Sequence, residues 1–304
     1  SDEPAETERI RGTFAKLNGA AAVLHLANAL TLCGLVFGAD KDWSIPVVAR
    51  YALWERPDGG GDCDPIENPC TIREETEVLF NASLGTLVTL FSFLSVINHL
   101  VFAVALLRAR GNNAKDKRAT GLGADILLSY TNEKYYRNAF RWGEYSVSAG
   151  IMLYIIAALS GLSSLYDLLW IMAAVFATMW LGHATDCARY RSDRAYLYAA
   201  GCVVHTLTWI PIIYAFTKGT GTSDAPDAVK AIIWVLLVFY ASFGAIPFFQ
   251  YFVVLDGRKM DQAARNRRAE ISYIILSYVS KTVLTWLVYS GVFMRDRFGI
   301  EAAV

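Results

Sequence analysis

The run from Ile271 to Met294 reads ISYIILSYVSKTVLTWLVYSGVFM, and its one charged residue, Lys281, lies near the middle. About 20 apolar residues are enough to cross the hydrocarbon core of a bilayer as a helix. The run therefore predicts a membrane-spanning helix. A charge at the centre of such a helix costs about 2.5–3.5 kcal/mol on insertion scales, so Lys281 needs a partner or a chemical task.

The whole chain has the composition of a multi-pass membrane protein. Of its 304 residues, 55% are hydrophobic and only 18% are charged, and the mean hydropathy is positive. These values, with the spacing of the apolar runs, predict an all-α bundle of seven transmembrane helices that forms one domain over residues 1–304. The expected helices cover residues 13–38, 77–108, 132–160, 163–188, 194–217, 228–255 and 267–294.

The basic residues are distributed unequally between the two sides of this bundle. Of the 28, 18 lie in the N-terminal segment and in the loops that follow the second, fourth and sixth helices. Because Lys and Arg are enriched in cytoplasmic loops, we expect the N-terminus to be cytoplasmic and the C-terminus extracellular.

The first loop, residues 39–76, is then an extracellular insertion. Aromatic and β-branched residues between Trp43 and Trp54 predict a short β-hairpin in it. Cys63 and Cys70 lie seven residues apart in a Gly- and Pro-rich stretch of the same loop, which favours a disulfide over the alternative of two free thiols.

Polar residues at helical spacing accompany Lys281. Ser277 precedes it by one turn on the same face, and Arg141, Glu144 and Ser148 share one face of the third helix. A carboxylate such as Glu144 would stabilise a cation on Lys281, whether an ammonium or a protonated Schiff base formed with a carbonyl ligand. Two alternatives stay open: Lys281 as a purely structural ion pair, and Arg141 with Glu144 as charges at the inner membrane edge.

Two histidines, His25 and His99, interrupt the first two apolar helices. We expect them to face a polar cavity on the cytoplasmic side, where an imidazole could hold a proton; a hydrogen-bonded structural role is the alternative. The structural role is expected for His183 and His205. Because the four histidines are dispersed along the chain, we expect no metal site. Because phosphate-binding and nucleophile motifs are absent from the sequence, we expect that the chain is not an enzyme.

The stretches NAFRWGEYSVSAGIML (138–153) and LSYVSKTVLTW (276–286) resemble those of heliorhodopsins, retinal-binding seven-helix proteins whose membrane orientation is inverted relative to other microbial rhodopsins. VLHLANAL in the first helix and INHLVF in the second extend the similarity. The resemblance implies a rhodopsin-like bundle that holds all-trans retinal on Lys281 as a protonated Schiff base. It also implies that Glu144 is the sole acidic counterion.

The resemblance assigns further residues to the site. Ser277 and Ser148 would lie near the Schiff base. The retinal would be lined by Met179, Trp209, Tyr240, Phe243 and Pro247. A polar proton cavity would contain His25, His99, Arg141 and Tyr145. Two features depart from the family: the first loop is longer and carries Cys63 and Cys70, and Pro247 replaces an expected polar residue.

The implied function is light sensing rather than pumping. Outward proton pumps carry a proton donor eleven residues after the counterion, and here that position is Ile155. We expect a homodimer in the cell membrane that signals to a cytoplasmic protein through its basic loops and binds no nucleic acid. The alternatives are a light-gated or light-driven proton or ion conductor, and a retinal-free seven-helix receptor or transporter.

Overall fold

The computed structural model describes residues 3–38, 44–55, 71–109, 122–131, 138–221, 227–253 and 261–290. Within these ranges the elements run in the order α1 (Glu3–Val36), β1 (Ser44–Glu55), β2 (Thr71–Ser83), α2 (Leu84–Arg108), α3 (Leu122–Thr131), α4 (Ala139–Leu159), α5 (Leu165–Cys187), α6 (Arg191–Gly221), α7 (Asp227–Tyr251) and α8 (Gln262–Val288). All the helices except α3 are long and apolar enough to cross a membrane, which makes seven among the described residues. The predicted all-α membrane bundle is confirmed.

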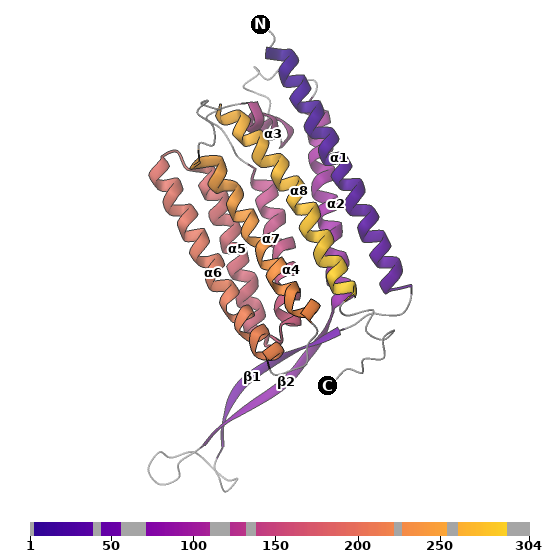
Figure 1. Ribbon diagram of the computed structural model, residues 1–304, viewed down its shortest axis with the longest axis vertical. Coiled ribbons are helices and arrows are strands. Elements are labelled where there is room, and N and C mark those ends of the chain that lie inside the picture. The colour runs from indigo at the N-terminus through magenta and orange to yellow at the C-terminus, as the bar shows by residue number, and fades with distance from the viewer. Residues whose placement is uncertain are drawn as a thin grey trace.

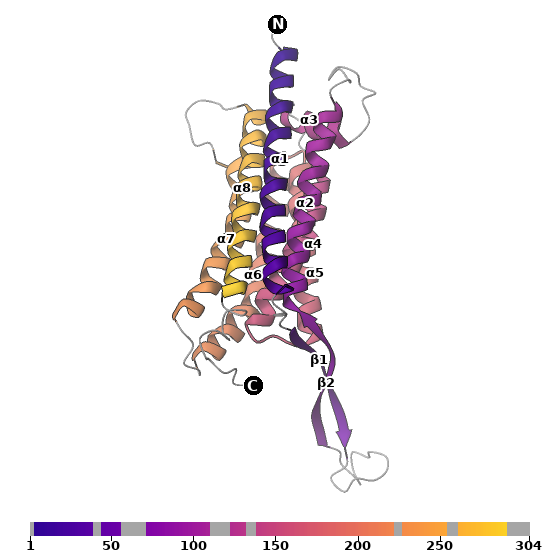
Figure 2. The ribbon, with the colours of Figure 1, turned by 90° about the vertical axis from the view of Figure 1, so that its right-hand side faces the viewer.

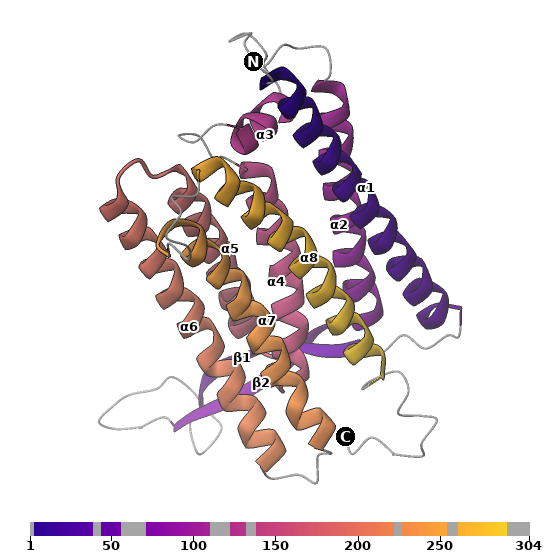
Figure 3. The same cartoon turned by 45° about the horizontal axis from the view of Figure 1, so that its top comes forward.

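The seven long helices lie side by side along one axis (Figure 1). α6 and α1 lie on opposite flanks in two views, with α4, α5, α7 and α8 between them (Figures 1 and 3). α4 is the most enclosed: 67% of its apolar window is buried, against 28% for α5, α6 and α7. Side chains of α4 can therefore contact several other helices at once.

The distribution of side chains between inside and outside fits a bilayer. Large apolar side chains such as Val23, Trp170 and Val238 are exposed on the outer surface, where lipid would cover them. Polar side chains such as Ser92 and Ser277 are fully buried inside the bundle. Because polar groups inside a membrane are costly, the buried ones mark the region in which a functional site is expected.

The predicted hairpin is present and is longer than expected. β1 and β2 pair antiparallel along their whole length and extend beyond the end of the bundle that is opposite the start of α1 (Figure 2). The backbone N–H of Val48 donates to the carbonyl of Ser163 at 2.9 Å, which ties the base of the hairpin to the connection between α4 and α5. Cys63 and Cys70 lie outside the described residues.

The predicted start of the second helix, residue 77, is wrong. Residues 71–83 form β2, and α2 begins only at Leu84. The side chain of Ser83 accepts a hydrogen bond from the N–H of Thr86 at 3.0 Å, so it caps the first turn of the helix. The strand ends in the apolar residues 78–80 (VLF), and only residues 81–83 (NAS) separate them from the apolar helix, so hydropathy placed the start of the helix too early.

Other helix ends also differ from the predicted bounds. α1 and α8 begin earlier than predicted, at Glu3 and Gln262, and α6 is longer at both ends. α4 begins at Ala139; residues 132–137, where an earlier start was expected, lie outside the described part of the chain.

The short helix α3 was not predicted. It packs on α1 and α2 through a separate apolar cluster that includes Phe14, Leu106 and Tyr130. Side chains of α8 bind its last carbonyls: Asn266 Nδ2 donates to Ser129 at 3.3 Å, and Arg267 donates to Tyr130 at 2.9 Å. These carbonyls have no donor within their own helix, so α8 supplies the C-terminal cap of α3.

Candidate functional site

Lys281 is buried in the interior, 2% exposed, and hydrogen-bonded to three side chains. Its Nζ donates to Glu144 Oε1 at 2.9 Å and to Ser148 Oγ at 3.0 Å, and also contacts Ser95 Oγ. The carboxylate compensates the charge, and the hydroxyls complete the polar shell that a buried ion pair requires. The predicted partner, Glu144, therefore lies against Lys281 in the structure.

Three helices meet at this pair. α4 presents Glu144 and Ser148 one turn apart, and α2 presents Ser95, whose hydroxyl also donates to Glu144 Oε1 at 3.2 Å. Ser277 is fully buried one turn before Lys281 on α8. Sequence reasoning missed Ser95. Its position one turn before His99 on α2 was the available signal.

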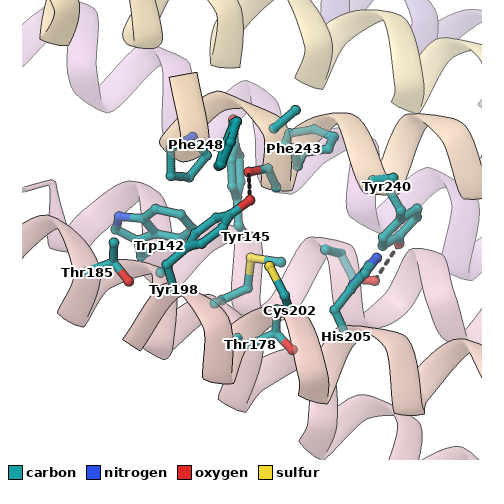
Figure 4. Close-up of a pocket in the computed structure, with 18 of the residues that line it drawn as sticks. Trp142, Tyr145, Thr178, Thr185, Tyr198, Cys202, His205, Tyr240, Phe243 and Phe248 are labelled. Atoms are coloured by element: carbon teal, nitrogen blue, oxygen red, sulfur yellow. Dashed lines mark hydrogen bonds between the residues drawn. The ribbon is translucent and has the colours of Figure 1, made fainter. Parts of the chain in front are cut away.

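A cavity of about 480 Å³ extends from Lys281 between α4, α5, α6 and α7. Of the predicted ligand-contacting residues, six line it: Ser148, Met179, Tyr240, Phe243, Pro247 and Lys281. Trp209 lies behind the wall, with its ring centroid 5.5 Å from that of Tyr240. Figure 4 shows the aromatic side chains gathered around this space. A long apolar molecule with one reactive end at Lys281 fits such a cavity.

The lining also contains residues that sequence reasoning did not assign to the site. Trp142 and Tyr273 line the cavity beside α4 and α8, and His205 lines it from α6, where only a structural role was expected. The ring of Tyr145 lies 5.6 Å from Lys281 Nζ and makes an edge contact with Phe243. Aromatic rings therefore surround both the lysine and the space beyond it.

His25 and His99 lie side by side in the interior of the bundle. Their rings are stacked with centroids 5.4 Å apart, and His25 makes an edge contact with Tyr278 of α8. The Nδ1 of His99 lies 2.9 Å from the side-chain carbonyl of Asn18, a distance at which the imidazole N–H donates to that oxygen. The histidine pair is buried between α1, α2 and α8.

Arg141 contacts a different set of residues from the histidine pair. It forms ion pairs with Glu270 and, at 3.7 Å, with Asp186, and its guanidinium lies 4.1 Å from the ring centroid of Tyr273. All three charged side chains are buried. The other member of the predicted proton cavity, Tyr145, donates its hydroxyl to the carbonyl of Tyr273 at 3.3 Å.

The Arg141 cluster connects four helices beside the cavity. Trp142 Nε1 donates to Asp186 at 2.7 Å, and the hydroxyl of Tyr251 donates to the other oxygen of Asp186 at 2.8 Å. Sequence reasoning missed Asp186 and Glu270. Asp186 lies at the end of α5, and Glu270 lies near the start of the last helix as hydropathy predicts it, positions where a charge is ordinarily solvated. Nothing in the sequence shows that these positions are enclosed.

Gly182 of α5 allows Trp142 to reach its position. A Cβ at residue 182 would lie 2.5 Å from the indole ring, so a side chain there forces the ring to move. We expect Gly182→Ala to lower the free energy of unfolding by about 1–3 kcal/mol, the usual cost of overpacking. Gly150→Ala is the matched control, because a Cβ there meets only Met172 Cε at 3.9 Å. Unfolding midpoints in SDS would measure both; equal midpoints would contradict this role of Gly182.

Comparisons with known proteins match the chain by sequence family and by overall fold. A family model described as Heliorhodopsin matches residues 126–293, more than half of the chain. A thermophilic rhodopsin has a TM-score of 0.60 at 11% identity, covering 96% of this chain and 97% of that one. A thermophilic rhodopsin from Rubrobacter xylanophilus has a TM-score of 0.53 at 12% identity, covering 92% and 96%. These structures show the shared fold, and no curated protein sequence matches the chain.

Proposed function

Because this chain belongs to the heliorhodopsin family, we propose that it is a light sensor whose retinal is bound covalently to Lys281. Retinal is the chromophore that the family implies. The observation that carries the proposal is the buried amine of Lys281 at the mouth of an aromatic cavity, with a carboxylate 2.9 Å away. The residues present fit an elongated apolar aldehyde that reacts at one end.

Each residue around Lys281 has a specific task in this proposal. Bound retinal supplies the absorption of visible light and a light-driven change of shape. Lys281 holds the aldehyde carbon as a protonated Schiff base, and Glu144 balances its charge. Ser95 and Ser148, which already bind the Lys281 nitrogen, keep it oriented toward Glu144. The aromatic walls exclude water, which strengthens the attraction between the two charges.

The surroundings of Lys281 support sensing over pumping. Glu144 is the one carboxylate within ion-pair distance of Lys281 in the described part of the chain. Ile155, at the donor position of outward pumps, is fully buried among apolar residues of the core. Directional transport needs separate groups that accept and donate the proton, so we propose signalling without net transport and without enzymatic activity.

Ion conduction is the second candidate because His25, His99 and Asn18 form a buried polar group near Lys281. An imidazole pair can share a proton and pass it on. Illumination of voltage-clamped cells that express the protein with all-trans retinal separates the two candidates. We expect a visible absorption band and light-induced absorbance changes without a stationary photocurrent. A sustained photocurrent would establish conduction, and the lack of a visible band would refute the light-sensing proposal.

The orientation and assembly of the protein are further parts of the proposal. The excess of basic residues at the end where α1 begins supports a cytoplasmic N-terminus and an extracellular hairpin. On the family resemblance, we propose that the protein forms a homodimer in the lipid bilayer. We also propose that it signals to a cytoplasmic partner. In a variant whose other four cysteines are replaced by serine, labelling Cys187, an exposed thiol at the end of α5, with a membrane-impermeant maleimide in intact and opened cells tests the orientation. Labelling in opened cells alone is expected; labelling in intact cells would reverse the assignment.

A further inference from the structure

Trp142 joins the wall of the cavity to a buried carboxylate at the end of α5. Its indole ring lines the cavity, where Figure 4 shows it among the other lining residues. Its Nε1 donates to Asp186 Oδ2 at 2.7 Å, and Asp186 is not among the residues that line the cavity. Both side chains are buried. Trp142 therefore contacts both the space that would hold a ligand and a charged group outside that space.

The other hydrogen-bonding aromatic residues of the lining make no such link in the described part of the chain. Tyr145, Tyr198 and Tyr240 each donate a hydroxyl to a backbone carbonyl, and these carbonyls belong to Tyr273, Gly244 and Ala149. All three acceptor residues line the cavity themselves. The bond from Trp142 to Asp186 is therefore the one by which an aromatic lining residue reaches a charged side chain beyond the wall.

The backbone of α5 limits where the indole of Trp142 can move. Gly182 and Asp186 lie one turn apart on α5 and thus on one face of that helix. The indole packs directly on Gly182, since a Cβ at that position would lie 2.5 Å from the ring. The ring has no room to move toward α5, and close-packed interiors transmit such a displacement instead of absorbing it. A ligand that presses on the indole from the cavity must therefore tilt or slide it along α5, which changes its hydrogen bond to Asp186.

Asp186 joins the adjoining ends of three helices. Its Oδ1 accepts at 2.8 Å from the hydroxyl of Tyr251, the last residue of α7. The guanidinium of Arg194, on α6, lies 4.2 Å from the ring centroid of Tyr251. Arg194 also donates to the carbonyls of Thr185 and Ala188 at the end of α5, at 3.1 and 2.6 Å. The two oxygens of Asp186 are thus divided between the indole of the cavity wall and the hydroxyl that holds the end of α7.

We propose that Trp142 is a positioning residue that transmits a light-driven change in the cavity to Asp186, and through Asp186 to the adjoining ends of α5, α6 and α7. The inference rests on the proposed function, because the change of shape comes from a ligand held at Lys281. It adds the route by which that change leaves the cavity. When the indole is displaced, its N–H···O bond lengthens, and the carboxylate shifts toward its remaining partners, Arg141 and Tyr251.

Infrared difference spectra between illuminated and dark protein test this coupling. The protein is reconstituted with all-trans retinal and contains tryptophan labelled with a heavy isotope at the indole nitrogen; each spectrum is scaled to the visible band that the sample forms. We expect a light-induced indole N–H band that the label shifts, together with a carboxylate band. Trp142→Phe keeps an aromatic ring but lacks the N–H, so it should remove the indole band and reduce the carboxylate band.

Two further variants assign the bands. Asp186→Asn should remove the carboxylate band and shift the indole band without removing it, because a neutral oxygen is a weaker acceptor than a carboxylate. Trp170→Phe is the matched control, because Trp170 is exposed on α5, and it should change neither band. A tryptophan that only packs in the core would affect the unfolding midpoint and would contribute no light-induced N–H band.

The outcomes separate this inference from the proposed function. If the visible band responds to light but no indole band does, or if that band persists in Trp142→Phe, the inference is refuted and light sensing stands. An Asp186 band that Trp142→Phe leaves unchanged also refutes it, since Asp186 then responds by another route. If no visible band forms, the proposed function fails and the inference fails with it. Either Trp142→Phe or Asp186→Asn assigns the indole band, so misfolding of one variant does not prevent a decision.

Discussion

Lys281→Ala is expected to abolish the visible absorption band of protein reconstituted with all-trans retinal. Lys281 supplies the primary amine that lines the cavity, and without it the aldehyde has no covalent attachment there. The measurement is an absorption spectrum of wild type and variant, with hydroxylamine added to bleach a Schiff base. A band that survives in Lys281→Ala would place the chromophore on another residue and refute the assignment.

Two further variants make this result independent of folding. Lys281→Ala leaves Glu144 buried without its cation, which is expected to destabilise the protein by about 3–5 kcal/mol. Lys281→Met combined with Glu144→Gln removes both charges, so it should fold close to wild type and still lack the band. Glu144→Gln alone keeps the lysine and should bind retinal with a shifted band, since the charge that stabilises the protonated nitrogen is lost.

Arg141→Met is expected to lower the free energy of unfolding by about 3–5 kcal/mol, because it leaves Glu270 and Asp186 buried without their cation. The change in unfolding midpoint in SDS measures this effect. Arg9→Met is the matched control: Arg9 is exposed near the start of α1, and its replacement should change the midpoint little.

A compensating variant tests whether the loss comes from unpaired charge. Adding Glu270→Met and Asp186→Asn to Arg141→Met removes the uncompensated carboxylates and should recover most of the stability, since well-packed neutral residues often replace buried ion pairs at little cost. A loss below about 1 kcal/mol for Arg141→Met alone would be the size of an exposed ion pair and would show that the cluster is solvated in the native protein.

The spanning helices were predictable because lipid leaves the backbone few alternatives. Every peptide group within the hydrocarbon must be paired, so long apolar runs become helices. β2 and α3 were not predictable from hydropathy. β2 ends in the apolar residues 78–80 (VLF), only three residues before the apolar helix α2 begins. α3 has only ten residues, and its burial depends on α1 and α2. Contacts distant in sequence determine both elements.

The lysine and its counterion were predictable from the cost of a buried charge. Hydropathy places Glu144 near a helix end and Lys281 near a helix centre. The structure reconciles these positions because α8 begins well before α4 does along the bundle axis. Arg141, near the start of α4, pairs with Glu270, which lies eight residues, about 12 Å of helix, after Gln262 at the start of α8. Relative shifts of this kind are set by packing between helices, which also explains why the Asp186 cluster was missed.

α8 carries Lys281, Glu270 and the Asn266–Arg267 cap of α3 on a single uninterrupted helix. Fifteen residues separate Asn266 from Lys281, about 22 Å at 1.5 Å per residue. A helix of this length rotates about its axis as a stiff unit, so a rotation at Lys281 turns the end near Asn266 by the same angle. Such a rotation would therefore directly change the hydrogen bonds that α8 makes to the carbonyls of Ser129 and Tyr130.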